Sequence, residues 1–83
     1  MTRQLNEKGY FKTQDLALAT AISLFYPLEA IDRDANPRKA QFVFGQANGL
    51  DELIASFSRR ELKVDPQSYY DAMRLIKGRL YEN

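Results

Sequence analysis

Two residue types that carry much of protein chemistry are missing from this chain of 83 residues. The absence of cysteine excludes disulfides, thiolate nucleophiles and thiolate metal sites. The absence of histidine removes the commonest general base and the commonest transition-metal ligand. Gly45, Gly49 and Gly78 are isolated, so the sequence has no phosphate-binding glycine loop. We therefore expect a protein that is not an enzyme, with no cofactor, no metal and no small-molecule substrate.

Long apolar runs are missing as well. The first ten residues, MTRQLNEKGY, contain none, so we expect no signal peptide. The longest apolar stretch, Leu16 to Pro27, is interrupted by Thr20 and Ser23. It is shorter than the roughly 20 residues that a membrane span needs. We expect a cytoplasmic protein that does not enter a membrane.

The composition that remains is that of one small packed domain. Hydrophobic residues make up 45% of the chain, which favours a folded core over a disordered tail. Twelve basic and eleven acidic residues leave a net charge of +1, which excludes a strongly basic nucleic-acid wrapper but leaves room for local patches. We expect a single domain over residues 1–83, with residues 1–9 as a flexible lead-in.

The first expected element is an apolar helix. Thr13 is the predicted N-cap of a helix over residues 14–25, which ends before Pro27. The helix is apolar nearly all round, which is typical of a helix at the centre of a core or at an oligomer interface. We favour the central position.

A hairpin and a second helix are expected next. Leu28–Asp32 and Lys39–Gly45 are predicted antiparallel strands, and in the second strand Phe42 and Phe44 share one face. A helix follows over residues 49–58, with Asn48 as its expected cap and a regular apolar stripe.

The last third of the chain contains an ambiguous segment and a clear helix start. Glu61–Val64 alternates polar and apolar residues, so it is either a third strand or an extended linker with Leu62 and Val64 turned inward. Asp65 followed by Pro66 predicts the start of a helix that reaches about Tyr81. The expected fold class is α+β, in the order α-β-β-α-(β)-α, with an antiparallel hairpin packed against three helices.

One segment resembles the start of a calcium-binding loop. Asp32, Asp34 and Asn36 have the alternating spacing of oxygen ligands in an EF-hand. Pro37 stands where that loop needs glycine, and Val43 stands where it needs a bidentate glutamate. We favour a hairpin turn in which these side chains bond their own backbone.

The last predicted helix has an aromatic and basic flank. Four residues of this flank fall within about 60° of one another on a helix surface: Tyr70, Arg74, Lys77 and Tyr81. Such a flank can stack on bases and pair with phosphates. The plainer interpretation, which we favour, is that these side chains border the core and extend into solvent.

Two short basic clusters are further candidate contacts for a partner. One comprises Arg59, Arg60 and Lys63, and the other comprises Arg33, Arg38 and Lys39. If they share one side of the domain, they could contact phosphates. We favour charge complementarity at a helix end for the first cluster and loop solvation for the second.

From Phe11 onward the chain resembles a family of small uncharacterised microbial domains of unknown function. The resemblance rests on several short motifs: Lys12 to Leu16, Phe42-Val43-Phe44, Leu50 with Leu53, Val64, Tyr69, Leu75 to Lys77, and Leu80-Tyr81. It covers most of the chain. Because these motifs are structural, the resemblance implies a fold and no particular activity.

These observations favour a non-enzymatic binding module. The first hypothesis is a protein-interaction or small adaptor domain, which self-associates if its apolar first helix is not fully covered. The alternative is a nucleic-acid-binding accessory domain that uses the aromatic and basic flank of the last helix or the basic clusters. Near-neutral net charge places the first hypothesis ahead of the second.

Overall fold

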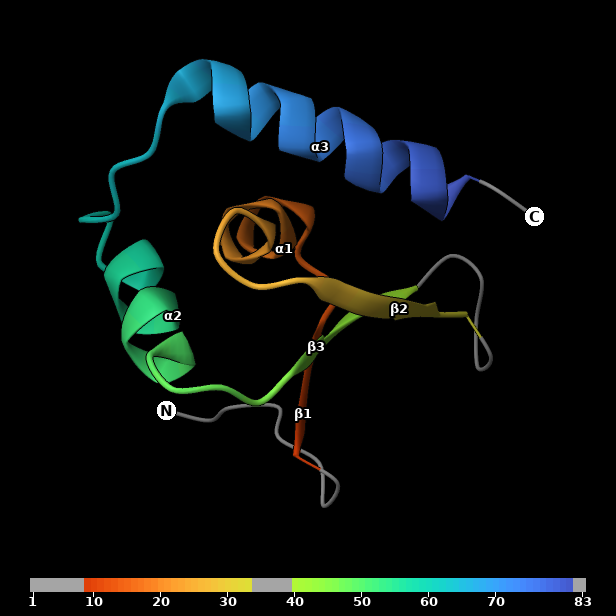
Figure 1. The fold of residues 1–83 in the computed structure, drawn as a ribbon, viewed down its shortest axis with the longest axis horizontal. Coiled ribbons are helices and arrows are strands. Elements are labelled where there is room, and N and C mark those ends of the chain that lie inside the picture. Colours follow the sequence, from red (N-terminus) through yellow and green to blue (C-terminus); the bar gives the residue numbers. More distant parts are fainter. Residues whose placement is uncertain (1–8, 34–39, 82–83) are drawn as a thin grey trace.

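The computed structural model describes residues 9–33 and 40–81, which form three strands and three helices. The elements are β1 (Tyr10–Thr13), α1 (Leu16–Ser23), β2 (Leu28–Asp32), β3 (Gln41–Gly45), α2 (Leu50–Ser58) and α3 (Pro66–Leu80). The α+β class is confirmed. The predicted element order is wrong in one respect, because the third strand opens the chain instead of following the second helix (Figure 1).

The strand that the sequence did not predict is β1. It pairs antiparallel with β3 and places Phe11 opposite Phe44. The backbone N–H of Gln46 donates to the carbonyl of Gly9 at 2.8 Å, which extends this pairing by one bond. Of the predicted lead-in, residues 1–8 lie outside the described residues. Gly9, its last residue, is bonded through its carbonyl to Gln46, the residue that follows β3.

The three strands form one antiparallel sheet in the order β1-β3-β2, which confirms the predicted hairpin between β2 and β3. Phe42 and Phe44 are buried on its inner face, as predicted. Val43, on the outer face, is also only 8% exposed. Above it the ammonium of Lys12 on β1 reaches the carboxylate of Asp32 on β2 at 3.0 Å, so an ion pair between the two outer strands crosses β3.

Asp15, and not the predicted Thr13, caps the start of α1. Its carboxylate accepts from the N–H groups of Ala17 at 3.0 Å and Leu18 at 3.3 Å. Thr13 is the last residue of β1, and its hydroxyl accepts from the Asp15 N–H at 3.1 Å. Thr13, the predicted cap, therefore belongs to the strand, and α1 is shorter at both ends than the expected residues 14–25.

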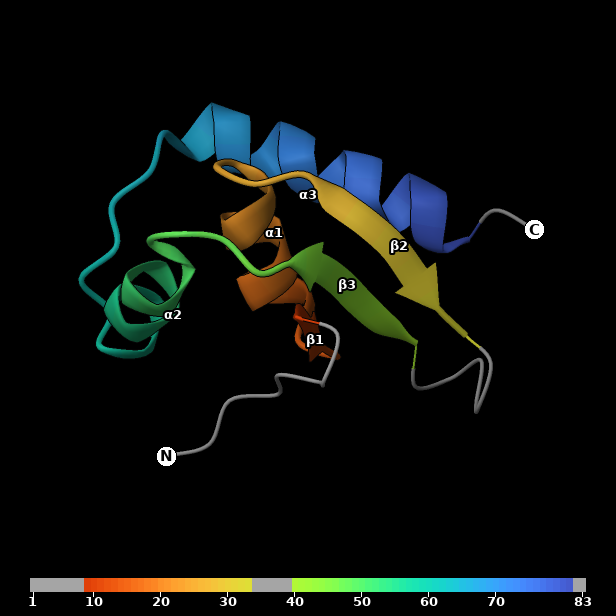
Figure 2. The same ribbon diagram turned by 60° about the horizontal axis from the view of Figure 1, so that its bottom comes forward.

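The central position predicted for α1 is confirmed. Figures 1 and 2 show this helix between the sheet and α3, with α2 beside it. Thr20 and Ile22 are fully buried, and the Thr20 hydroxyl donates to the carbonyl of Leu16 at 2.8 Å. Ala19 of α1 also belongs to the core, and the other buried apolar residues of the cluster come from the elements around this helix: Phe11, Phe42, Phe44, Leu50 and Ile76. No residue of α1 is exposed, so this helix offers no open apolar face.

The start of α2 differs from the prediction by one residue. Gly49, with φ of 89°, is the N-cap, and Asn48 is not. The carbonyl of Asn48 instead accepts from the Tyr26 hydroxyl at 2.7 Å. A left-handed backbone at this position favours glycine, because a Cβ there is strained.

Side chains form hydrogen bonds with backbone groups at both ends of α3. The Asp65 carboxylate accepts from the Ser68 N–H at 2.8 Å, which confirms the predicted cap. This hydrogen bond holds the pKa of Asp65 below its usual value. At the other end, the Arg33 guanidinium donates to the carbonyls of Arg79 at 2.7 Å and Leu80 at 3.0 Å. Within the described ranges, no helix has the length and apolar character that a bilayer crossing requires.

Candidate functional site

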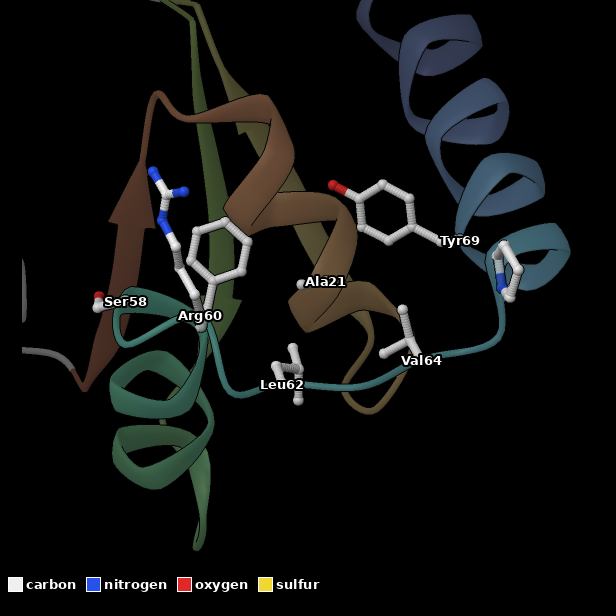
Figure 3. Close-up of a pocket in the computed structure, with 8 residues that line it drawn as sticks. Ala21, Ser58, Arg60, Leu62, Val64 and Tyr69 are labelled. Carbon is white, nitrogen blue, oxygen red and sulfur yellow. The ribbon is translucent and has the colours of Figure 1, made fainter.

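An open groove lies between α1, the end of α2 and the start of α3 (Figure 3). Its volume is about 780 Å³, within the range of natural ligand-binding clefts. Apolar or aromatic residues from four segments line most of it: Ala21, Phe57, Leu62, Val64, Pro66 and Tyr69. Ser58 and Arg60 add polar groups at the α2 end. We call this site the linker groove, because residues 61–65 join α2 to α3 along one side of it.

The floor and far wall of the groove come from α1 and α3. Ala21 of α1 lies at the bottom of the groove and is almost fully buried. Because its side chain is a single methyl group, it leaves space above the helix. Tyr69 points from α3 toward α1, and its hydroxyl donates to the carbonyl of Ala17 at 3.1 Å (Figure 3). Burial raises the pKa of this phenol, and the negative charge of Asp15 raises it further. Tyr69 therefore remains a neutral hydrogen-bond donor that fixes α3 against α1.

The near wall is the linker itself. Leu62 and Val64 are half-buried and point from the linker toward α1 (Figure 3), whereas Glu61 and Lys63 are exposed. The inward direction predicted for Leu62 and Val64 is confirmed. The alternative that Glu61–Val64 is a third strand is wrong, because the segment pairs with no strand among the described residues.

Arg60 occupies the end of the groove opposite Tyr69 (Figure 3) and has an unusual backbone. Its φ is 63°, the left-handed conformation that glycine usually adopts after a helix. The Arg60 N–H donates to the Phe57 carbonyl at 3.0 Å, and the Glu61 N–H donates to the Ser56 carbonyl at 2.9 Å. These two bonds form a Schellman motif, with arginine at the position where glycine is usual.

Of the three basic residues at this end of the groove, only Arg59 forms an ion pair among the described residues. Arg59 forms an exposed ion pair with Glu61, with 2.9 Å between Nε and Oε1. In the described part of the chain, no carboxylate pairs with Arg60 or Lys63, and both side chains are exposed. The cluster predicted from Arg59, Arg60 and Lys63 thus lies at the linker groove, with two of its three cations available.

The aromatic and basic flank predicted from Tyr70, Arg74, Lys77 and Tyr81, which we call the α3 stripe, lies on the exposed side of α3, as its spacing predicts. Tyr70 is 62% exposed and Tyr81 is 76% exposed, and Arg74 and Lys77 are exposed between them. The Arg74 guanidinium carbon lies 5.7 Å from the centroid of the Tyr70 ring, which is a cation–π distance. The helix leads away from α2 (Figure 1), so the stripe and the α2-end cluster do not form one compact patch.

The other candidate sites are only partly described. Of the basic cluster in the hairpin, Arg33 is engaged at the end of α3, and Arg38 and Lys39 lie outside the described residues. Of the calcium-like segment, Asp34, Asn36 and Pro37 also lie outside them. In the ranges that are described, no group of three or more carboxylates forms a potential metal site.

A family model described as a domain of unknown function, DUF5659, matches residues 8–82. The chain belongs to the DUF5659 family. This confirms the resemblance to a family of small uncharacterised domains, and the match spans both the linker groove and the α3 stripe. Neither the curated proteins nor the solved structures contain a match to the chain.

Proposed function

We propose that this DUF5659 domain is a non-enzymatic binding module that holds a segment of a protein partner in the linker groove. The observation that carries the proposal is the groove itself, an open apolar cleft with an available cation at one end. A folded domain of this size gains stability by closing apolar surface, so an open apolar cleft favours an interaction site. The residues of α1 are buried or half-buried, which weakens the first reason to expect self-association. Phe25, which follows α1 and belongs to the predicted helix, is 55% exposed.

The experiment is a selection of hexapeptides from a displayed random library on the immobilised full chain. Leu62→Asp places a charge in the groove, and Leu75→Asp is the matched control on α3, where Leu75 is 72% exposed. We expect selected peptides to bind the wild type and Leu75→Asp alike, and to lose at least tenfold in affinity for Leu62→Asp. Circular dichroism confirms that both variants are folded.

Two outcomes contradict this proposal. The first is a selection that enriches no peptide over the uncoated surface. The second is a set of peptides that bind Leu62→Asp as well as the wild type. Light scattering over a range of concentrations tests whether a second copy of the chain is the occupant. If Leu62→Asp dissociates a dimer and no peptide is enriched, the occupant of the groove is a second copy of the chain, which contradicts the proposal of a different protein partner.

A second candidate function, nucleic-acid binding, is supported by the α3 stripe. Tyr70 and Arg74 are both exposed and lie within cation–π distance, so a planar base could stack beside them. We expect oligo(dT) binding at low ionic strength that weakens as salt rises, and a shallower salt dependence for the double variant Arg74→Ala/Lys77→Ala. The control variant Arg59→Ala removes an exposed cation elsewhere. Absence of salt-dependent binding at low ionic strength contradicts this candidate.

A further inference from the structure

The linker that borders the groove has the alternating sequence pattern of a strand but pairs with no strand among the described residues. Leu62, Lys63 and Val64 alternate apolar, polar and apolar, and their side chains alternate half-buried, exposed and half-buried. Figure 3 shows the chain running without a helical coil from Leu62 past Val64 to the start of α3. Within the described residues, no backbone hydrogen bond joins these three residues to any other segment.

Unpaired backbone groups beside an apolar cleft have a specific complement. In strand addition, an extended peptide bonds its main chain to a free strand edge and places alternate side chains in neighbouring pockets. Because strand residues rise about 3.3 Å each, three linker residues match three to four residues of a peptide. A helical ligand would not use the free backbone groups of the linker, since its own are bonded internally.

The charges around the linker indicate what the peptide carries. Arg60 and Lys63 are exposed cations without a carboxylate partner in the described ranges, whereas Arg59 is paired with Glu61. Arg60 also lines the groove at one end. An acidic residue at one end of the peptide would therefore meet Arg60 when the apolar side chains of the peptide occupy the cleft.

We propose that an extended, acidic-ended peptide segment of a protein partner adds as a strand along Leu62–Val64, with alternate apolar side chains in the linker groove. This inference rests on the proposed function and specifies the form of its ligand. In this arrangement, main-chain hydrogen bonds to Leu62, Lys63 and Val64 provide the affinity for the peptide. The cleft and Arg60 select its side chains and therefore provide the specificity.

The first test compares two displayed hexapeptide libraries of equal composition, each ending in Asp or Glu. One places apolar residues at positions 1, 3 and 5, as a strand requires, and the other at positions 1, 4 and 5, as a helix requires. We expect at least tenfold more enrichment from the first library. Enrichment of the second alone overturns strand addition and leaves the groove as a binding site. Enrichment of neither overturns the proposed function as well.

The second test follows amide hydrogen exchange of the ¹⁵N-labelled full chain with an enriched hexapeptide. Successive N–H groups of a strand point to opposite edges, so one edge receives the peptide. We expect slower exchange at Lys63 alone or at Leu62 and Val64 together, by at least tenfold. A peptide that shifts the resonances of groove residues without protecting any of these three amides overturns strand addition.

The third test concerns the acidic end of the peptide. Arg60→Ala is expected to weaken a hexapeptide ending in Asp at least fivefold more than its amidated counterpart ending in Asn. The matched variant Arg59→Ala removes an arginine already paired with Glu61, and is expected to affect both peptides equally. Equal losses for both peptides with Arg60→Ala overturn the charge assignment.

Discussion

At the scale of single residues, Arg60 combines a backbone conformation that costs stability with a side chain beside the linker groove. A left-handed backbone costs an L-residue roughly 1–2 kcal/mol, and glycine avoids this cost. A strained residue at the border of a cleft is typical of a functional position. The chain thus retains a cation at a point where its fold favours glycine.

Arg60→Gly is therefore expected to stabilise the domain by about 0.5–1 kcal/mol, since the lower strain is partly offset by the greater freedom of glycine in the unfolded chain. Arg59→Gly is the matched control, because Arg59 has an ordinary right-handed backbone with φ of −83°. It should not stabilise. Urea denaturation measures both free energies of unfolding, and equal destabilisation by the two substitutions would contradict the role given to Arg60.

Tyr69 leads to a prediction about pH. Its pKa is raised in the folded state, so the unfolded chain loses the phenolic proton first as pH rises. The free energy of unfolding should be unaffected by this group below its ordinary pKa of 10.0 and should fall as pH rises above it. Urea denaturation between pH 8 and 11 should show a shallower decline for Tyr69→Phe. A decline for Tyr69→Phe as steep as that of the wild type would contradict this role of Tyr69.

At the scale of elements, local signals explain why some segments were predictable. Asp65 and Pro66 start α3 through contacts within four residues, so the sequence contains the whole signal. The pairing of β1 is different, because its four residues pair with residues that lie 29 to 35 positions later in the chain. Glu61–Val64 has the clear alternating pattern of a strand but pairs with none of the strands that the structure describes, which no local pattern reveals.

The start of α2 leads to a prediction that pairs two glycines. At Gly49 an added Cβ would lie 2.8 Å from the Tyr26 hydroxyl, and the backbone is left-handed. At Gly78, within α3, an added Cβ meets nothing within 4 Å. Gly49→Ala should therefore destabilise by about 1–2 kcal/mol, and Gly78→Ala should stabilise by up to about 1 kcal/mol. Thermal denaturation measures both, and a stable Gly49→Ala protein would contradict the clash.

At the scale of the whole molecule, the sheet, α2 and α3 all pack around α1 (Figures 1 and 2). Loss of packing at its centre should therefore affect every element at once. Ile22 is fully buried, and Ile22→Ala should cost about 2–4 kcal/mol. Leu75→Ala, at a residue 72% exposed, should cost less than about 0.5 kcal/mol. Chemical denaturation followed by circular dichroism tests this, and similar losses would contradict the central role of α1.

Of the two candidate sites, the α3 stripe could be predicted from the sequence and the linker groove could not, because the groove depends on the packing of the whole molecule. The spacing of Tyr70, Arg74, Lys77 and Tyr81 places them on one flank because a helix fixes that geometry by itself. The linker groove depends on how far residues 61–65 stand from α1, and that distance is set by the packing of α2 and α3. The sequence predicted that Leu62 and Val64 turn inward, but not that they border an open cleft.

The place of β1 in the sheet has a consequence for folding kinetics. β2 and β3 are close neighbours in the chain, whereas β1 meets β3 only after a long loop containing α1 has closed. The entropy of that closure delays the pairing, so β1 should dock after the main barrier to folding has been crossed. Phe11→Leu should then leave the refolding rate nearly unchanged and accelerate unfolding. Among the three described strands, the first in chain order would then be the last to join the fold and the first to leave it.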